Sequence, residues 1–263
     1  MKFDIENYKR RTARLDDSDI DYDAFRQQPL DEATLRCVRY MHDVEHHTVC
    51  YLRDLLVTRA HQDPDITTFL TFWAYEEFWH GEALGKVLLA HDEPAGRLRV
   101  AATRARHRVT SAVSPHAAAV TSAITRHFTA VHMTWGAVNE WTTQAGYTRL
   151  AARAEHPILS RLVERITRQE GRHIDFYASE AARRLEQSRT AQRLTRFALS
   201  HVWNPVGSTV MPASEVGHLV RHLFSDDDGR TVAARIDRRI DHLPGLAGLN
   251  LIGTSVDRYA TAA

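Results

Sequence analysis

Apolar residues recur along most of the chain at the three- and four-residue spacing of one helix face, and strictly alternating segments are nearly absent. This pattern predicts an all-α protein. Four long helices are expected at 31–60, 65–91, 115–154 and 157–187, and shorter helices at 190–201, 213–224 and 229–241. We expect the third long helix to be interrupted near Ser122, and Asp65 to be the N-cap of the second.

The remaining segments carry weaker signals. Residues 1–30 are polar with short clusters of aspartate, which predicts a loose N-terminal arm with one short helix. The arginine-rich segment 95–113 is ambiguous, and the chain after 241 is expected to form an irregular tail. The length of 263 residues suits one large domain, with a helix bundle at 31–188 and the C-terminal segment 189–263 packed on it.

The segment "FWAYEEFWHGEAL" at 72–84 combines aromatic and charged residues in an unusual way. It places Glu76, Glu77 and His80 within the most aromatic stretch of the chain. Burying a carboxylate without a partner is energetically unfavourable. These groups must therefore face water or surround a positive charge.

The Glu-x-x-His pattern of this segment occurs again 93 residues later in "QEGRH". A spacing of three residues places both side chains of a pair on one helix face. The first and third long helices each add one glutamate, which gives the order Glu, Glu-x-x-His, Glu, Glu-x-x-His. This order is typical of bundles that hold two iron or manganese ions through carboxylates. The candidate metal ligands are Glu45, Glu77, His80, Glu140, Glu170 and His173.

The glutamates of this set lie on helix faces that are otherwise mostly apolar. Leu52 shares the face of Glu45, and Ile166 shares the face of Glu170. A single Glu-x-x-His pair arises by chance in many exposed helices. Four carboxylates on four core-facing stripes, however, require positive charge, which two divalent cations would supply.

The stretches "FWAYEEFWHGEALGKVL", "EWTTQAGYTRLA" and "LVERITRQEGRH" resemble the second, third and fourth helices of the soluble acyl-carrier-protein desaturases. The resemblance covers about 35–185 and continues more faintly to about 255. It implies a ferritin-like four-helix bundle with additional C-terminal helices and a di-iron cluster. By this resemblance, Glu77 and Glu170 bridge the two iron ions. Glu45 and Glu140 each chelate one iron, and each histidine ligates one.

The same resemblance implies three further site residues. Thr143 corresponds to a threonine that faces the dioxygen side of the cluster; alternatively, it is an ordinary helix threonine bonded to a carbonyl oxygen. Glu76 and Gln169 directly precede the two Glu-x-x-His pairs, where the family usually has an acidic residue. A metal-bound histidine normally donates its second N–H to such an acceptor. Gln169 can accept this bond without carrying charge, which puts redox tuning in doubt rather than metal binding.

Other histidines near the ligands allow several interpretations. His42 lies one turn before Glu45 and could approach the cluster, or it could be a solvated or core-edge histidine. His46 and His47 point away from Glu45 and are expected at the surface. Arylamine N-oxygenases on this bundle carry an additional histidine ligand where this chain has Ile166, which argues against that class.

The resemblance implies an O₂-dependent oxidoreductase that desaturates an acyl chain. Its implied partners are an acidic acyl carrier protein and a ferredoxin-like electron donor, and its implied assembly is a homodimer. Two alternatives stay open: a di-iron oxygenase or hydroxylase of specialised metabolism, and a non-enzymatic ferritin-like iron-binding protein.

Four arginines of the fourth long helix could bind an acidic carrier protein. They are spaced four, three and four residues apart and so form one stripe, which we expect to point away from the cluster. The alternative is a solvated face with pairing between Glu164 and Arg168. The arginine-rich segment 97–108 is a second candidate. The stripe consists of Arg161, Arg165, Arg168 and Arg172.

The net charge, the apolar segments and the cysteines bear on the partners and the location of the protein. The net charge of +1 favours neither a nucleic-acid nor a membrane partner. The chain has no apolar run long enough to span a membrane, and it starts without the apolar segment of a signal peptide. Cys37 and Cys50 are too far apart on one predicted helix to form a disulfide. A cytoplasmic protein is expected.

Overall fold

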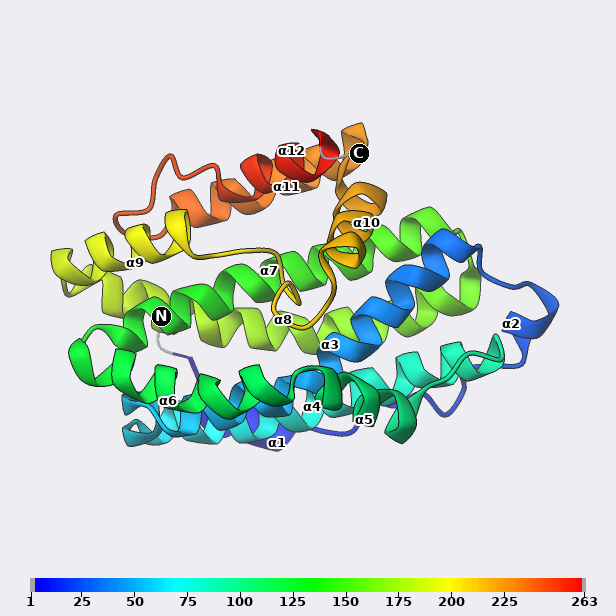
Figure 1. Cartoon of the computed structure of the whole chain (residues 1–263), viewed down its shortest axis with the longest axis horizontal. Coiled ribbons are helices and arrows are strands. Elements are labelled where there is room, and N and C mark those ends of the chain that lie inside the picture. The colour runs from blue at the N-terminus through cyan, green and yellow to red at the C-terminus, as the bar shows by residue number, and fades with distance from the viewer. Residues whose placement is uncertain (1–2, 262–263) are drawn as a thin grey trace.

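The computed structural model of the protein describes residues 3–261 and contains no β-strand within them. This range folds into twelve α-helices and one 3₁₀ helix, which confirms the predicted all-α class (Figure 1). The first half contains α1 (Ile5–Arg11), α2 (Ala24–Gln27), α3 (Glu32–Leu56), η1 (Arg59–Gln62), α4 (Pro64–Ala90), α5 (Gly96–Arg106) and α6 (Arg108–Ile124). The second half contains α7 (Phe128–Ala154), α8 (Pro157–Glu186), α9 (Arg189–His201), α10 (Ala213–Phe224), α11 (Asp227–Asp241) and α12 (Leu251–Thr261).

The four long helices form a bundle of two pairs. Helix α3 packs along α4, and α7 packs along α8. The pairs contact each other through α4 with α8 and through α3 with α7. Helices α5 and α6 contact α3 from outside, whereas α9 and α11 contact α7 on the other side of the bundle (Figure 1). Helix α10 contacts both α3 and α7. The interior of the bundle is therefore shared by all four long helices.

Local sequence signals explain where the long helices begin. The Asp31 side chain accepts a hydrogen bond from the backbone N–H of Thr34 at the start of α3. At the start of α4, Asp63 caps the helix and Pro64 takes the first position, where its missing N–H costs nothing. The predicted cap at Asp65 is thus wrong by two residues, because Pro64 already has the helical φ angle.

Three predicted boundaries differ from the structure. The third helix is indeed interrupted, but at 125–127 rather than at Ser122, and its two parts are α6 and α7, of which α6 begins earlier than predicted, at Arg108. The ambiguous segment 95–113 forms α5 and the start of α6. The expected irregular tail contains α12, whose backbone N–H groups at Ile252 and Gly253 donate to the buried Asp237 carboxylate at 2.9 Å each. This remote cap, which the spacing along the sequence does not indicate, fixes the start of α12.

The N-terminal arm is packed on the bundle rather than loose. Tyr8, Leu15, Ile20 and Phe25 are buried, and α1 contacts α4. No helix within residues 3–261 is long and apolar enough to cross a membrane. Both cysteines are free, in agreement with the sequence.

Two buried glycines of α7 give a direct test of this packing. A Cβ atom at Gly136 would lie 2.3 Å from the Tyr177 ring, whereas one at Gly146 would lie 3.5 Å from Met41. Gly136→Ala should therefore lower the free energy of unfolding by about 1–3 kcal/mol. Gly146→Ala should leave it unchanged or raise it by up to about 1 kcal/mol, because alanine favours the helix interior. Chemical denaturation of both variants measures this difference, and equal effects would contradict the packing.

Candidate metal centre

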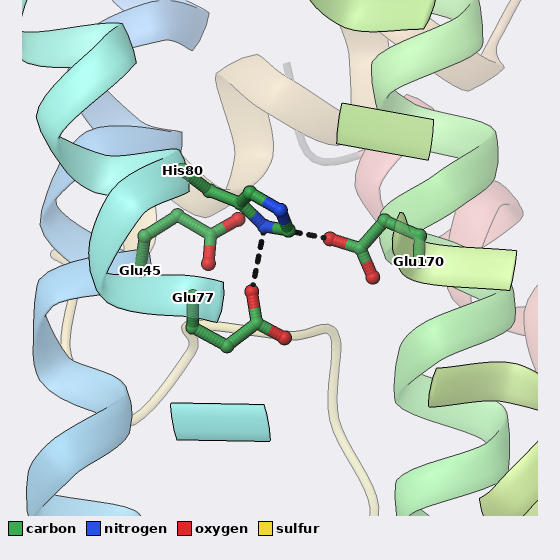
Figure 2. Close-up of side chains that lie close together, drawn as sticks. All are labelled: Glu45, Glu77, His80 and Glu170. Atoms are coloured by element: carbon green, nitrogen blue, oxygen red, sulfur yellow. Dashed lines mark hydrogen bonds and ion pairs between the residues drawn. The ribbon is translucent and has the colours of Figure 1, made fainter. Parts of the chain in front are cut away.

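All six predicted ligands meet at the centre of the bundle. They form two overlapping groups of buried side chains, and the ligand atoms of each group lie within 4.8 Å of one another. Each group could hold a metal ion. The first group is Glu45, Glu77, His80 and Glu170 (Figure 2), and the second is Glu77, Glu140, Glu170 and His173.

The two shared carboxylates each turn one oxygen toward each histidine. Glu77 Oε2 lies 2.9 Å from His80 Nδ1, and its Oε1 lies 3.2 Å from His173 Nδ1. Glu170 Oε1 lies 3.3 Å from His80 Nδ1, and its Oε2 lies 3.4 Å from His173 Nδ1. This geometry suits two bridging carboxylates, with Nδ1 as the nitrogen of each imidazole that faces the site.

The opposite nitrogen of each histidine is held by the other Glu-x-x-His helix. His80 Nε2 on α4 lies 2.8 Å from Gln169 Oε1 on α8, and His173 Nε2 on α8 lies 2.8 Å from Glu76 Oε2 on α4. Gln169 also donates from Nε2 to the Ala13 carbonyl oxygen, which fixes the direction of its amide. With Nε2–H donating in both histidines, Nδ1 keeps a free lone pair for a metal.

Glu76 is fully buried and accepts bonds from two more residues. Tyr8 Oη donates to it at 3.0 Å, and the Arg172 guanidinium at 2.5 Å. Burial alone would raise the pKa of Glu76, but His173 and Arg172 outweigh it and lower the pKa. The prediction that Arg172 points outward is wrong, because its long side chain reaches back to this carboxylate. Neither Tyr8 nor Arg172 was recognised as a site residue from the sequence.

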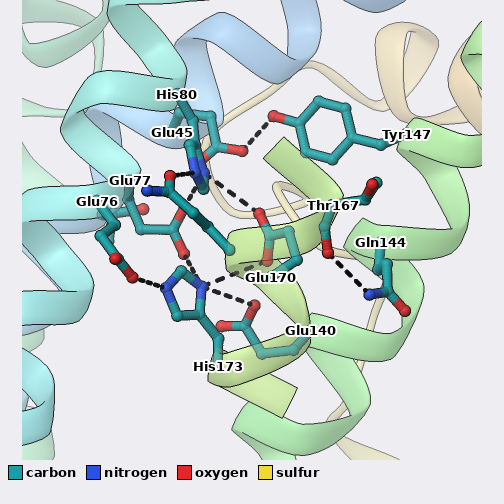
Figure 3. A network of polar contacts seen from close by, with 12 residues as sticks. Glu45, Glu76, Glu77, His80, Glu140, Gln144, Tyr147, Thr167, Glu170 and His173 are labelled. Carbon is teal, nitrogen blue, oxygen red and sulfur yellow. Dashed lines mark hydrogen bonds and ion pairs between the residues drawn. The ribbon is translucent and has the colours of Figure 1, made fainter. Parts of the chain in front are cut away.

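The two terminal carboxylates also have partners that sequence reasoning missed. Trp73 Nε1 donates to Glu140 Oε1 at 3.0 Å. The Tyr147 hydroxyl donates to Glu45 (Figure 3). A signal was present for both residues. Trp73 lies one turn before Glu77, and Tyr147 lies two turns after Glu140, so each shares the face of a ligand.

The four carboxylates differ in the direction of their pKa shifts: the pKa is raised in the two terminal glutamates and lowered in the two shared ones. Burial raises the pKa of Glu45 well above its usual value, and the neighbouring Glu77 raises it further. The pKa of Glu140 is raised by burial as well. For Glu77, burial acts in the same direction, but His173 and His80 outweigh it and lower the pKa.

The pKa values of the other three ligands, Glu170 and His173 on α8 and His80 on α4, are also shifted. Burial raises the pKa of Glu170 too, but the histidines outweigh it, and the net pKa is lowered. Burial alone would lower the pKa of His80, yet the neighbouring carboxylates of Glu170 and Glu77 raise it well above its usual value. Burial alone would also lower the pKa of His173, but Tyr8 and the surrounding glutamates outweigh it and raise the pKa well above its usual value. These directions favour protons on Glu45, Glu140, His80 and His173 when no metal is bound.

Unpaired atoms at the centre fit a metal better than protons alone. Among the described residues, both oxygens of Glu170 and Nδ1 of His173 are buried without a hydrogen-bond partner of acceptable geometry. Buried polar atoms without partners are rare in folded proteins. Six oxygen and nitrogen donors around these atoms match the ligands that divalent transition metals take.

A cavity of about 510 Å³ adjoins the centre. Glu45, Glu77 and Glu140 contribute to its wall, and so does Thr143. In the described residues, the Thr143 hydroxyl has no hydrogen-bond partner. The hydroxyl of Thr142 beside it donates to carbonyl oxygens one turn back. Thr143 thus lies in the cavity wall without the bond to a carbonyl oxygen that Thr142 makes, and its role at the site stays a prediction.

The neighbouring histidines belong to neither group. His42 is buried and contacts Asp43 at 3.0 Å through Nδ1. His46 is buried too, so its expected surface position is wrong. The physical reason is α5, which covers this face of α3 and pairs Arg99 with Asp43 at 2.6 Å. His47 is half-buried.

The arginine stripe on α8 is largely engaged in ion pairs. Arg161 and Arg165 both contact Asp19 of the N-terminal arm, at 2.9 and 2.5 Å. Arg168 pairs with Glu164 at 2.9 Å, as the solvated-face alternative anticipated. A carrier protein on this stripe would have to compete with these pairs.

Metal loading tests the two-ion arrangement. Anaerobic ferrous iron should bind at about two ions per chain. Its binding should release about four protons, because the two histidines and the two terminal glutamates must give theirs up. Calorimetry in buffers of different ionisation enthalpy measures both numbers. Glu45→Gln should release one proton fewer, and Glu77→Ala should lose much of the iron. Full iron occupancy in Glu77→Ala would contradict the bridging role.

The hydrogen bond from Gln169 to His80 predicts a measurable effect on metal affinity. Gln169→Leu should weaken iron binding by roughly 10- to 100-fold, the usual cost of losing such a partner of a metal-binding histidine. Gln144→Leu is the matched control, because Gln144 bonds the Thr167 carbonyl oxygen on α8 and no ligand. Competition with a chelator measures both affinities, and equal values for the two variants would show that Gln169 does not support the site.

Comparisons with known proteins give no further assignment. No family model matches the chain, and neither curated proteins nor solved structures yield a match. Any function must therefore be argued from the metal centre and its cavity.

Proposed function

We propose that this protein is an O₂-dependent di-iron oxidoreductase that acts on an acyl chain, most simply as a fatty acyl desaturase whose substrate is linked to an acyl carrier protein. One observation carries the proposal. Two buried Glu/His groups share Glu77 and Glu170 and face a cavity large enough for a small-molecule substrate. The resemblance of the ligand-bearing segments to acyl-carrier-protein desaturases supports the choice of reaction.

The donor set favours iron. Carboxylate and imidazole ligands without any thiolate suit iron or manganese better than a structural zinc site. When bound, a pair of iron ions supplies the redox chemistry by which dioxygen oxidises an unactivated C–H bond. The residues of the chain would bind and orient the substrate, exclude water and transfer protons.

The cavity would bind and orient the acyl chain. Beyond the carboxylates, its wall includes the apolar side chains of Leu219, Val220 and Phe224 on α10 and of Ile252 and Val256 on α12. An apolar chain between these helices would exclude water from the carboxylates. Exclusion of water strengthens every charge interaction at the centre and protects the reaction from competing hydrolysis and proton leakage.

Thr143 and the bonded carboxylates would handle protons. Desaturation removes two hydrogens from neighbouring carbons, and with two electrons and two further protons it reduces one dioxygen to two waters. Thr143 would pass a proton, because it lies in the cavity wall and its hydroxyl has no hydrogen-bond partner among residues 3–261. Trp73 and Tyr147 hold Glu140 and Glu45 in fixed orientations. We assign the electrons to a ferredoxin-like donor and the assembly to a homodimer.

A second candidate function is a hydroxylase on the same centre. The cavity wall also contains a polar pair, in which Tyr51 Oη lies 2.7 Å from His132 Nε2, and the nearby Asn139. These groups would suit a substrate with a polar substituent near the reacting carbon. A non-enzymatic iron-binding role has no need of such a cavity.

Product analysis separates these functions. Iron-loaded protein with a ferredoxin-like reducing system and ¹⁸O₂ should convert an acyl-carrier substrate into a product that has lost two hydrogens and gained no label. Gain of one labelled oxygen would instead identify a hydroxylase. Thr143→Val should lower turnover by about 10- to 100-fold without loss of iron, if it passes a proton. Iron and O₂ uptake without any altered product would overturn the enzymatic proposal.

A further inference from the structure

Helix α6 turns its apolar side chains toward solvent. Val109, Val113, Val120 and Ile124 are 77%, 58%, 60% and 79% exposed. Their intervals of four, seven and four residues place them on one face along the whole helix. A surface helix normally has the opposite polarity. Together with the exposed residues Ala112, Ala117 and Ala123, these side chains form what we call the apolar stripe.

The inner face of α6 is polar and is tied to the bundle by hydrogen bonds. Ser122 Oγ accepts from the backbone N–H of Arg59 at 2.8 Å, and its carbonyl oxygen accepts from Arg59 Nε at 3.0 Å. Ser114 Oγ accepts from Arg53 at 3.1 Å. These bonds fix the rotation of α6 about its axis. The outward direction of the apolar stripe follows from this fixed rotation.

The segment that contains α5 and α6 is also strongly basic. No acidic residue occurs between Glu93 and Glu140, whereas six arginines do. Arg99 pairs with Asp43. The other five arginines are exposed and have no acidic partner within residues 3–261. They are Arg97, Arg104, Arg106, Arg108 and Arg126.

These charges identify the kind of partner that covers the stripe. A second copy of the chain would bring two acid-free arginine clusters together, and like charges across an interface are unfavourable. The anchors of protein interfaces are most often Trp, Tyr and Arg; 94–127 offers arginines but contains no Phe, Trp or Tyr. A row of aliphatic side chains roughly 23 Å long, beside unpaired arginines, instead suits an anionic surface with an apolar interior.

We propose that the surface formed by α5 and α6 binds an anionic lipid bilayer. The stripe and Leu98 of α5, which is 82% exposed, enter the boundary between headgroups and acyl chains. The five unpaired arginines contact lipid phosphates. Since the net charge of the whole chain is only +1, this local charge is invisible in the overall composition. The inner face of the same helix lines the cavity through Ser111 and Ser114, which places the cavity close to the lipid.

Sedimentation with vesicles tests the proposal on the full chain without metal. It therefore succeeds or fails independently of the proposed function. The protein should bind vesicles of phosphatidylcholine and phosphatidylglycerol far better than vesicles of phosphatidylcholine alone. Binding should weaken as salt is raised.

Matched substitutions separate the two contributions. Val113→Ser and Val120→Ser should each weaken binding to the anionic vesicles by about tenfold. Arg104→Gln, Arg106→Gln and Arg108→Gln should each weaken it by about fivefold. The controls remove the same groups on the other side of the bundle: Phe197→Ser on α9, and Arg235→Gln, Arg238→Gln and Arg239→Gln on α11. Circular dichroism should show all variants folded, because every changed side chain is exposed.

Three outcomes would overturn the proposal. The first is no binding to either kind of vesicle, which would favour an acidic protein as the partner. The second is an equal loss of binding in the three α11 control variants, which would indicate unspecific charge attraction. The third is a dimer that Val113→Ser and Val120→Ser dissociate in light scattering, which would make the apolar stripe a contact between two copies of the chain.

Discussion

The burial of four carboxylates at one point is the constraint on which the rest of this structure depends. In a medium of low dielectric, their mutual repulsion would open the bundle unless positive charge lies among them. Two imidazoles turn Nδ1 into the centre from opposite helices, which allows either protons or metal ions to supply that charge. The buried aromatic side chains of Phe69, Trp73 and Tyr177 lie beside the centre and lower the local dielectric, which makes uncompensated charge there more costly.

The need to satisfy buried polar groups extends from the centre to the N-terminal arm. Once His173 donates to Glu76, that carboxylate still needs partners, and Tyr8 of α1 and Arg172 of α8 supply them. On the other side, the Gln169 amide needs an acceptor, and Ala13 of the arm provides one. The arm is thus tied to the two histidines through hydrogen bonds. Its packing follows from the chemistry of the site more than from its own weak helical signal.

The sequence predicted those features that depend on local spacing. Glu77 and His80, like Glu170 and His173, were assigned to one helix face because three residues separate them, and the structure agrees. Features that depend on residues far apart along the chain were missed. His46 was expected at the surface because the position of α5 could not be inferred from α3 alone. Likewise, α12 begins where Asp237 caps it, and no local pattern identifies a cap from fourteen or more residues away.

The neutral amide of Gln169, opposite the charged carboxylate of Glu76, makes the two halves of the centre unequal. His173 is supported by a charged carboxylate that Arg172 partly balances, whereas His80 is supported by a neutral amide. An imidazole whose N–H is bonded to a charged acceptor is a more basic ligand and binds a metal ion more strongly. An ion held by His173 and Glu140 would therefore be stabilised in a higher charge state than one held by His80 and Glu45. The pairwise geometry of the ligands is nearly symmetric, so this inequality comes from their supporting residues.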